Sequence, residues 1–144
     1  MNLFEYPIHV GQAEPGCFSA TCRDVPGLQA LATDQGEALA KASAALDEVF
    51  AGLMRQGQEL PTPSPAKRGE QLVSPRVETV AKAALYVAMR EAGITKVQLA
   101  QRMGVDEKEV RRLLDPHHGS KLPAIARAVS LLGKRLVIGL EAAS

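Results

Sequence analysis

The stretch Thr95–Leu114, which reads TKVQLAQRMGVDEKEVRRLL, decides the fold of the second half of the chain. It places Ala100, Gly104 and Val110 at the spacing of a helix-turn-helix unit. Such a unit needs a small residue where its helices cross, a glycine where the backbone turns through positive φ, and a β-branched anchor in the second helix. Because the second helix can lie in the major groove of DNA, the stretch predicts a DNA-binding unit. Its other buried positions are predicted to be Leu99, Met103, Val105 and Leu113.

The composition is that of a small globular protein. With 144 residues, of which 46% are apolar, the chain can form one or two domains. Aromatic residues make up only 3%, which argues against nucleic-acid binding by base stacking. No apolar run reaches the ~18 residues that span a membrane, and the N-terminus lacks the features of a signal peptide. We therefore expect a cytoplasmic protein without a membrane segment.

Charge is distributed unequally between the two halves. Residues 1–70 contain five Lys and Arg against nine Asp and Glu, a net charge of −4. Residues 71–144 contain twelve Lys and Arg against seven Asp and Glu, a net charge of +5. This asymmetry indicates two different partners. Nucleic acid suits the basic half, and a basic protein suits the acidic half.

The first half has the pattern of a β-β-β-α domain. Apolar and polar residues alternate over residues 4–10 and 18–23, and a short strand is predicted near residues 28–32. Pro7 has no N–H to donate, so the first strand is expected at a sheet edge or bulged. Asp34 and Glu37 resemble a capping box before a helix that packs on the sheet. The apolar stripe of this helix contains Leu39, Ala42, Leu46, Val49, Phe50 and Leu53.

The chain then passes through a proline-rich stretch into a mostly helical half. Three prolines within residues 61–65 favour an extended, semi-rigid linker, although a short strand could form at 71–74. Helices are predicted over residues 75–92 and 122–132, on either side of the helix-turn-helix unit. Apolar residues alternate again over residues 134–141, which predicts a terminal β-strand. Since a lone strand needs a partner, it predicts pairing with a second copy, and hence a homodimer or a higher oligomer.

Several short motifs resemble those of the HicB antitoxins of bacterial HicA–HicB toxin–antitoxin pairs. In the first half they are Tyr6-Pro7, Gly16–Ser19, Asp24–Leu28, Glu37-Ala38 and Leu60–Ser64. Arg23 departs from the pattern, since the family usually has Pro before this Asp-x-Pro-Gly turn. Val110–His118 and Leu132–Leu136 resemble the C-terminal region of HicB members that carry helix-turn-helix domains.

The resemblance implies an α+β protein with two functional domains. Residues 1–60 would be a small, degenerate ribonuclease-H-like domain that binds a HicA-like toxin. HicA toxins are small, basic, mRNA-cleaving proteins with an essential histidine. Residues 61–74 would be the linker, and residues 75–144 would bind the operator DNA of the protein's own operon and form the dimer.

The candidate DNA-binding residues lie on the helix-turn-helix unit and in the loop that follows it. Arg111 and Arg112 are the strongest candidates for contacts with guanine or phosphate. The acidic residues Glu107 and Glu109 make the start of the second helix less cationic, and Glu107 could accept from a cytosine amino group. The alternative for each residue is a solvated helix face. The full set is Lys96, Gln98, Glu107, Lys108, Arg111, Arg112, His118 and Lys121.

The candidate toxin-binding residues are carboxylates of the acidic half, together with the first strand as an exposed edge. A basic ribonuclease would be steered by such a surface. The alternative is ordinary surface charge. The candidates are Asp24, Glu37, Asp47 and Glu48.

The sequence contains no recognisable catalytic or metal-binding pattern. The acids of the first half are scattered, and no Ser-His-Asp order or phosphate-binding glycine loop occurs. His117 and His118 lack a third ligand at zinc spacing, and Cys17 and Cys22 are expected to be free thiols on opposite faces of a strand. We therefore expect no enzyme, no metal and no cofactor.

The sequence leaves three functions open. The first is an antitoxin that neutralises a HicA-like toxin and represses its own operon. The second is a stand-alone transcriptional regulator with a small sensory N-terminal domain. The third is an interaction module with a vestigial DNA domain.

Overall fold

The computed structural model describes residues 4–142 and divides the chain into two compact units. The first unit extends to Val80 and the second begins at Ala81. This division lies inside helix α2, Val77–Ala92, and so differs from the boundary expected at residues 61–74. No helix among residues 4–142 is long and apolar enough to cross a membrane.

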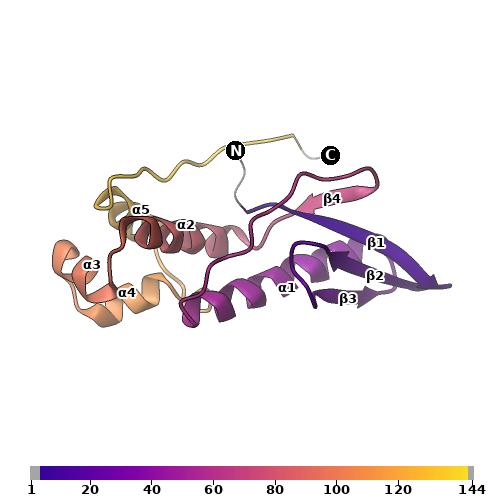
Figure 1. Ribbon diagram of the computed structural model, residues 1–144, viewed down its shortest axis with the longest axis horizontal. Helices are drawn as coiled ribbons and strands as arrows, with labels where there is room; N and C mark the ends of the chain where they lie inside the picture. Colours follow the sequence, from indigo (N-terminus) through magenta and orange to yellow (C-terminus); the bar gives the residue numbers. More distant parts are fainter. Residues whose placement is uncertain (1–3, 143–144) are drawn as a thin grey trace. The chain divides into compact units, whose positions relative to one another are not determined.

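The first unit is a four-stranded antiparallel sheet with one long helix. Its elements are β1 (Tyr6–Glu14), β2 (Cys17–Cys22), β3 (Gln29–Ala32), α1 (Gln35–Arg55) and β4 (Glu70–Val73). The strands are ordered β3-β2-β1-β4 (Figure 1). The predicted β-β-β-α order is confirmed, and β4 is added to it.

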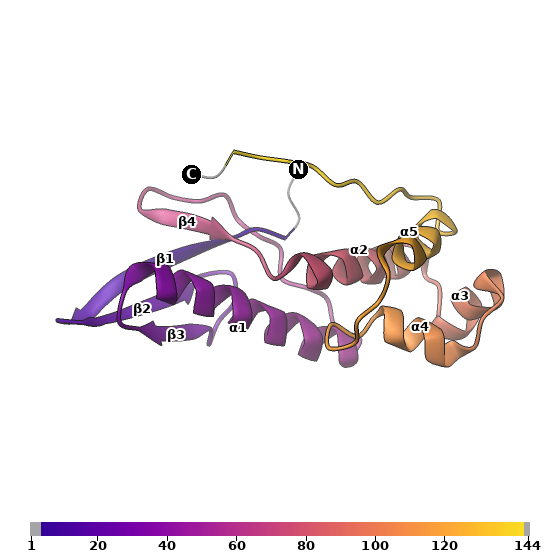
Figure 2. The same ribbon diagram turned by 180° about the vertical axis from the view of Figure 1, so that it is seen from behind.

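The core of the first unit lies between α1 and one face of the sheet, as Figure 1 and Figure 2 show from opposite sides. Tyr6 and Phe50 meet edge to face, with ring centroids 5.8 Å apart. Of the predicted stripe on α1, Ala42, Leu46 and Phe50 are buried, and the other three residues are half-buried. The buried row of α1 recurs every four residues, as one helix face requires. It consists of Ala38, Ala42, Leu46, Phe50 and Met54.

The first strand is an inner strand, which corrects the expectation of an edge. β1 pairs with β2 from Ile8 onward and with β4 over Tyr6–His9. Pro7 lies opposite Leu72 of β4 and before the first pair with β2. A residue without an N–H is tolerated there because β2 does not yet pair with it. The edge strands are β3 and β4.

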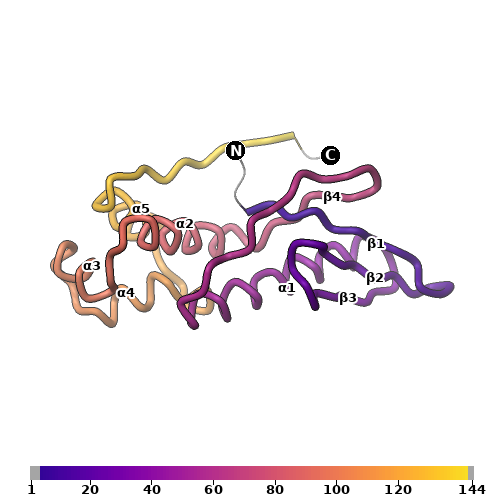
Figure 3. Tube along the Cα trace, in the orientation of Figure 1, coloured from indigo at the N-terminus to yellow at the C-terminus, as the bar shows by residue number. Residues whose placement is uncertain are grey.

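The segment expected as a linker is part of the first unit. Figure 3 shows it returning from the end of α1 to β4. The Tyr6 hydroxyl donates to the Pro61 carbonyl at 2.6 Å. The Asp24 carboxylate accepts from the backbone N–H and the hydroxyl of Ser64, both at 2.7 Å. Proline composition alone could not reveal these contacts, because their partners lie 40 and 55 residues away in the sequence.

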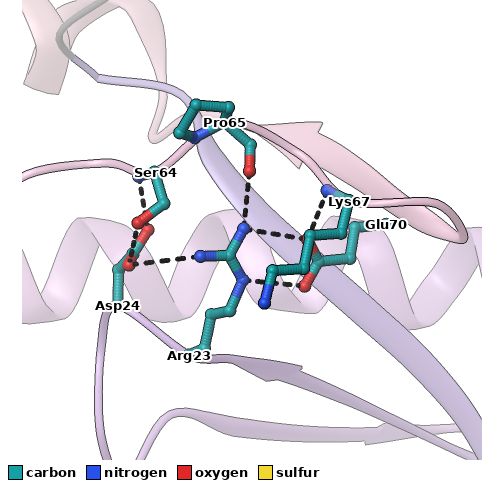
Figure 4. A network of polar contacts seen from close by, with 6 residues as sticks. All are labelled: Arg23, Asp24, Ser64, Pro65, Lys67 and Glu70. Carbon is teal, nitrogen blue, oxygen red and sulfur yellow. Dashed lines mark hydrogen bonds and ion pairs between the residues drawn. The ribbon is translucent and has the colours of Figure 1, made fainter.

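Arg23 ties the same segment to β4 (Figure 4). Its guanidinium donates to both carboxylate oxygens of Glu70 at 3.1 Å and to the Pro65 carbonyl at 2.5 Å. Such a fork is the geometry in which arginine binds carboxylate best. The hydrogen bond from Arg23 and one from the Lys67 N–H lower the pKa of Glu70. Arg23, which departs from the HicB pattern, therefore stabilises the position of β4 through Glu70.

The second unit is helical. After α2 come α3 (Lys96–Met103), α4 (Glu107–Leu113) and α5 (Leu122–Ser130). Its buried residues come from all four helices, and Leu85, Leu99, Val110 and Ala128 are fully buried. The terminal strand expected at residues 134–141 is not formed in the single chain, since this part has no strand assignment. The physical reason is that the second unit, as described, has no other strand to pair with it.

Removing the Tyr6 hydroxyl is expected to destabilise the first unit. Tyr6→Phe leaves the Pro61 carbonyl without its donor, which costs about 1 kcal/mol of unfolding free energy at neutral pH. Burial first, and the nearby Cys22 and Asp24 second, raise the pKa of Tyr6 in the folded protein. The unfolded chain therefore ionises at lower pH, so the stability that Tyr6 contributes decreases as pH rises above about 10. Urea unfolding at pH 7.5 and 10.5 measures both effects.

Tyr86→Phe is the matched control, because Tyr86 lies in the second unit. It should leave the alkaline loss of the first unit unchanged. An equal alkaline loss in Tyr6→Phe and in the wild type would contradict this role of Tyr6.

Candidate functional site

The α3–α4 unit, defined as Thr95–Leu114, has the local geometry that its sequence predicts. Thr95 and Gln98 form a capping box, with the Thr95 hydroxyl accepting from the Gln98 N–H at 3.1 Å and the Gln98 amide oxygen accepting from the Thr95 N–H at 3.0 Å. Gly104 ends α3 in the left-handed region, at φ 70°. Asp106 caps α4 by accepting from the Lys108 N–H at 3.2 Å. Of these residues, Gly104 is the one that the helix-turn-helix pattern singled out, and it turns the backbone between α3 and α4.

The apolar anchors of the α3–α4 unit are also where the pattern places them. Leu99 and Val110 are fully buried, and Ala100 and Leu113 are nearly so. Val105, in the turn, is half-buried. Two helices as short as these depend on tertiary packing for their stability.

The exposed face of α4 carries two arginines, each held by an acid of the same helix. Arg111 forms an ion pair with Glu107 at 3.5 Å, and Arg112 donates to Glu109 at 2.6 Å. The two arginine side chains are 59% and 42% exposed. Exposed pairs of this kind contribute about 0–1 kcal/mol. A competing anion can therefore replace the acids at small cost.

The other candidates for DNA contact are divided between α3 and the segment after α4. Lys96 begins α3, and Gln98 uses its amide oxygen in the capping box. Lys108 is exposed on α4, while His118 and Lys121 are exposed in the loop before α5. Asp115 orders this loop by accepting from the His117 N–H at 2.9 Å. Among residues 4–142, no group of three or more His, Cys, Asp or Glu side chains could hold a metal ion.

Two cations that sequence reasoning missed lie at the carboxyl ends of α3 and α4. Lys82 of α2 is buried, and its ammonium donates to the Arg112 carbonyl and to the Ser120 hydroxyl, both at 2.8 Å. Burial lowers the pKa of Lys82, and the charge of Asp115 partly opposes this. Arg127 of α5 donates to the Met103 carbonyl at 3.0 Å. The available signal for the first was a lysine within a run of apolar residues, between Ala81 and Ala83.

The four carboxylates expected at the toxin interface fall into two groups. Asp24 and Asp47 are largely buried, with 12% and 10% of their side chains exposed. Asp24 binds Ser64, and Asp47 accepts from the backbone N–H of Arg76 at 2.9 Å and from its guanidinium at 3.0 Å. Both carboxylates therefore bind partners within the first unit.

The other two carboxylates lie on the outer surface of α1. Glu48 is exposed, and Glu37 has a side chain that is 40% exposed. Glu37 accepts from the Thr33 hydroxyl at 2.9 Å and forms an ion pair with Lys41 at 3.2 Å. These contacts, Thr33 first, lower the pKa of Glu37. The expected capping box is therefore altered: the Asp34 carboxylate accepts from the Glu37 N–H, but the Glu37 carboxylate accepts from the Thr33 N–H in place of the Asp34 N–H.

Comparison with known proteins gives one consistent family. A family model described as a HicB-like antitoxin of bacterial toxin–antitoxin systems matches residues 5–84. Antitoxin HicB of Pseudomonas fluorescens (strain Pf0-1) is 31% identical over 98% of this chain and 97% of its own length. Antitoxin HicB of Escherichia coli (strain K12) is 28% identical over 91% of this chain and 95% of its own. Antitoxin HicB 1 of Photorhabdus laumondii is 27% identical over 94% of this chain and 86% of its own length.

These matches confirm the resemblance inferred from the motifs, and they extend over both units of the chain. The chain belongs to the HicB-like antitoxins of bacterial toxin–antitoxin systems.

Proposed function

We propose that this antitoxin neutralises a HicA-like, mRNA-cleaving toxin through its first unit and represses its own operon through the α3–α4 unit. The observation that carries the proposal is the separation of charge at the boundary between the units. The part up to Val80 contains six Lys and Arg against ten Asp and Glu, a net charge of −4. The part from Ala81 contains eleven Lys and Arg against six Asp and Glu, a net charge of +5. Opposite charges suit a basic toxin and DNA respectively.

On the toxin side, the outer surface of α1 is the best candidate for contact. Glu37 and Glu48 are its exposed carboxylates among the four candidates, whereas Asp24 and Asp47 support the unit from within. The β3 edge lies beside this helix, and Lys41 donates to the Leu31 carbonyl of that edge at 3.0 Å. Leu31 itself is 53% exposed, and it adds apolar area near Glu37, since Lys41 binds both residues. A basic partner would find both charge and apolar area there.

On the DNA side, α4 supports the recognition role. Arg111 and Arg112 are exposed and are held only by weak pairs within the helix. Phosphate or guanine can replace Glu107 and Glu109 as their partners. His118 and Lys121, in the loop that follows, suit contacts with the DNA backbone. Two copies of the unit would read half-sites about 34 Å apart, or a multiple of that distance.

A second copy of the chain is the proposed partner of residues 134–141. This segment forms no strand in the single chain, and Val137, Ile138 and Leu140 are 73%, 70% and 100% exposed. Exposed apolar residues favour pairing with another strand, and Ile138 and Leu140 would lie on the same face of such a strand. The same segment of a second copy would meet it with identical side chains about a two-fold axis.

The antitoxin role is tested by co-expression with the product of the neighbouring short gene. That product alone should stop growth, and the present chain should restore it. Glu37→Gln/Glu48→Gln is expected to weaken toxin binding about tenfold, because charge-assisted contacts are lost. Growth curves and titration calorimetry with the purified toxin measure the two effects.

Glu14→Gln/Glu59→Gln is the matched control, since it removes the same charge from two other exposed residues of the first unit. It should weaken binding less than about threefold, because distant charges are screened. Equal weakening by both variants would contradict a contact on α1. A harmless neighbouring product, or one that stays toxic, would contradict the antitoxin role itself and favour a stand-alone regulator.

The DNA-binding role is tested with Arg111→Gln/Arg112→Gln on DNA from upstream of the gene. Two lost base or phosphate contacts should weaken binding by about 100-fold. If both arginines contact phosphate, the slope of log K against log salt should fall by about 1.8. Fluorescence anisotropy at several salt concentrations measures both quantities.

Lys67→Gln/Arg68→Gln removes two exposed cations from the first unit and serves as the control. It should change neither the affinity nor the slope by much. Similar losses in the two variants, or equal binding of upstream and scrambled DNA, would contradict repression through α4.

The dimer is tested by light scattering after size exclusion. The wild type should have about twice the 15.3 kDa mass of one chain, and Ile138→Asp should shift it to the monomer because a charge then lies in the strand pair. Val77→Asp alters an equally exposed apolar residue of α2, 76% exposed, and should remain dimeric. A wild-type monomer, or a dimer unaffected by Ile138→Asp, would contradict pairing through residues 134–141.

A further inference from the structure

The two helices of the α3–α4 unit share one feature at their carboxyl ends. Each end is met by a long cation from a flanking helix, Lys82 from α2 and Arg127 from α5. The last carbonyls of a helix have no partner within the helix, and they carry the negative end of its dipole. A cation from a neighbouring helix satisfies both needs, and it also fixes the position of the helix end.

We infer that Lys82 and Arg127 are positioning residues for DNA recognition: they hold α4 and α3 in place and determine the selectivity of binding without contacting DNA. The inference rests on the proposed DNA-binding function. It assigns two of the eleven cations of the second unit to internal support, and so removes them from the set that would contact phosphate.

Lys82, Ser120 and the Arg112 carbonyl all form hydrogen bonds with one another at the end of α4. Its ammonium reaches the Arg112 carbonyl and the Ser120 hydroxyl at 2.8 Å, and Ser120 also donates to the Arg112 carbonyl at 3.4 Å. The set therefore joins α2, the last turn of α4 and the loop before α5. It fixes the backbone of Arg112, whose side chain is a candidate for DNA contact. The same loop carries His118 and Lys121.

α4 needs such an external anchor because it is short. It has seven residues, and a helix of this length is not stable on its own. Val110 and Leu113 fix its inner face by packing, but apolar contacts alone permit small rotations of a helix about its axis. A directional hydrogen bond at the carboxyl end limits this rotation. Base contacts in the major groove tolerate little displacement, whereas phosphate contacts tolerate more.

The test compares specific and non-specific DNA binding of Lys82→Met. Methionine has a similar length and no donor; it removes the cost of burying a charge, and Ser120 can still donate to the Arg112 carbonyl. We expect at least tenfold weaker binding to the upstream DNA and less than twofold change on scrambled DNA. The slope of log K against log salt should stay within about 0.3 of the wild type, because no phosphate contact is lost. Arg127→Met should behave in the same way.

Arg111→Gln is the matched control for a cation that does touch DNA. If Arg111 contacts phosphate, this variant should lower the salt slope by about 0.9. Ser120→Ala should lose part of the selectivity, since it removes one of the two acceptors of Lys82.

Hydrogen exchange without DNA provides a second, independent measurement. In Lys82→Met, amides of residues 107–121 should exchange faster, while those of β2 in the first unit stay unchanged. The inference is overturned by an equal loss of specific and non-specific affinity, by a fall in the salt slope, or by unchanged selectivity. If the wild type itself does not prefer the upstream DNA, the proposed function fails, and the inference fails with it. Faster exchange would then show only that Lys82 anchors α4.

Discussion

Two largely buried carboxylates, Asp24 and Asp47, hold the part of the chain on which the first unit depends. Asp24 binds Ser64 of the returning segment, and Asp47 binds Arg76 at the entry to α2. Between these two contacts, β4 pairs with β1 and closes the sheet on that side. Without them, residues 60–76 would be the extended, semi-rigid linker that their prolines favour. Breaking one such partially buried contact leaves a carboxylate without its donors, which is costly.

In the second unit, cations stabilise the fold through hydrogen bonds, as carboxylates do in the first unit. Lys82 and Arg127 reach across to the ends of α4 and α3, so their charge serves the fold. Charge that remains on the surface has a different use. Arg111 and Arg112 of α4 are exposed and held by weak pairs within the helix, which leaves them available for another partner. Burial and hydrogen-bond partners therefore distinguish charged residues that stabilise the fold from those that can bind another molecule. Residue type alone does not make this distinction.

Local patterns predicted the local parts of this structure. Gly104 ended α3 as expected, and the apolar stripe of α1 identified its buried face. β4 was only a possibility, because its four residues have a partner more than 60 positions away in the sequence. The roles of Asp24, Asp47 and Lys82 were missed because their partners also lie far along the chain, 40, 29 and 30 positions away. The strand expected at residues 134–141 depends on a partner outside the single chain.

The central claim is that the two units serve different partners. The most direct measurement is binding of the full-length protein to the toxin and to upstream DNA in parallel, for the α1 and α4 surface variants. The account predicts a clean separation, in which substitutions on α4 weaken DNA binding only and substitutions on α1 weaken toxin binding only. A variant on either helix that weakens both partners equally would contradict it.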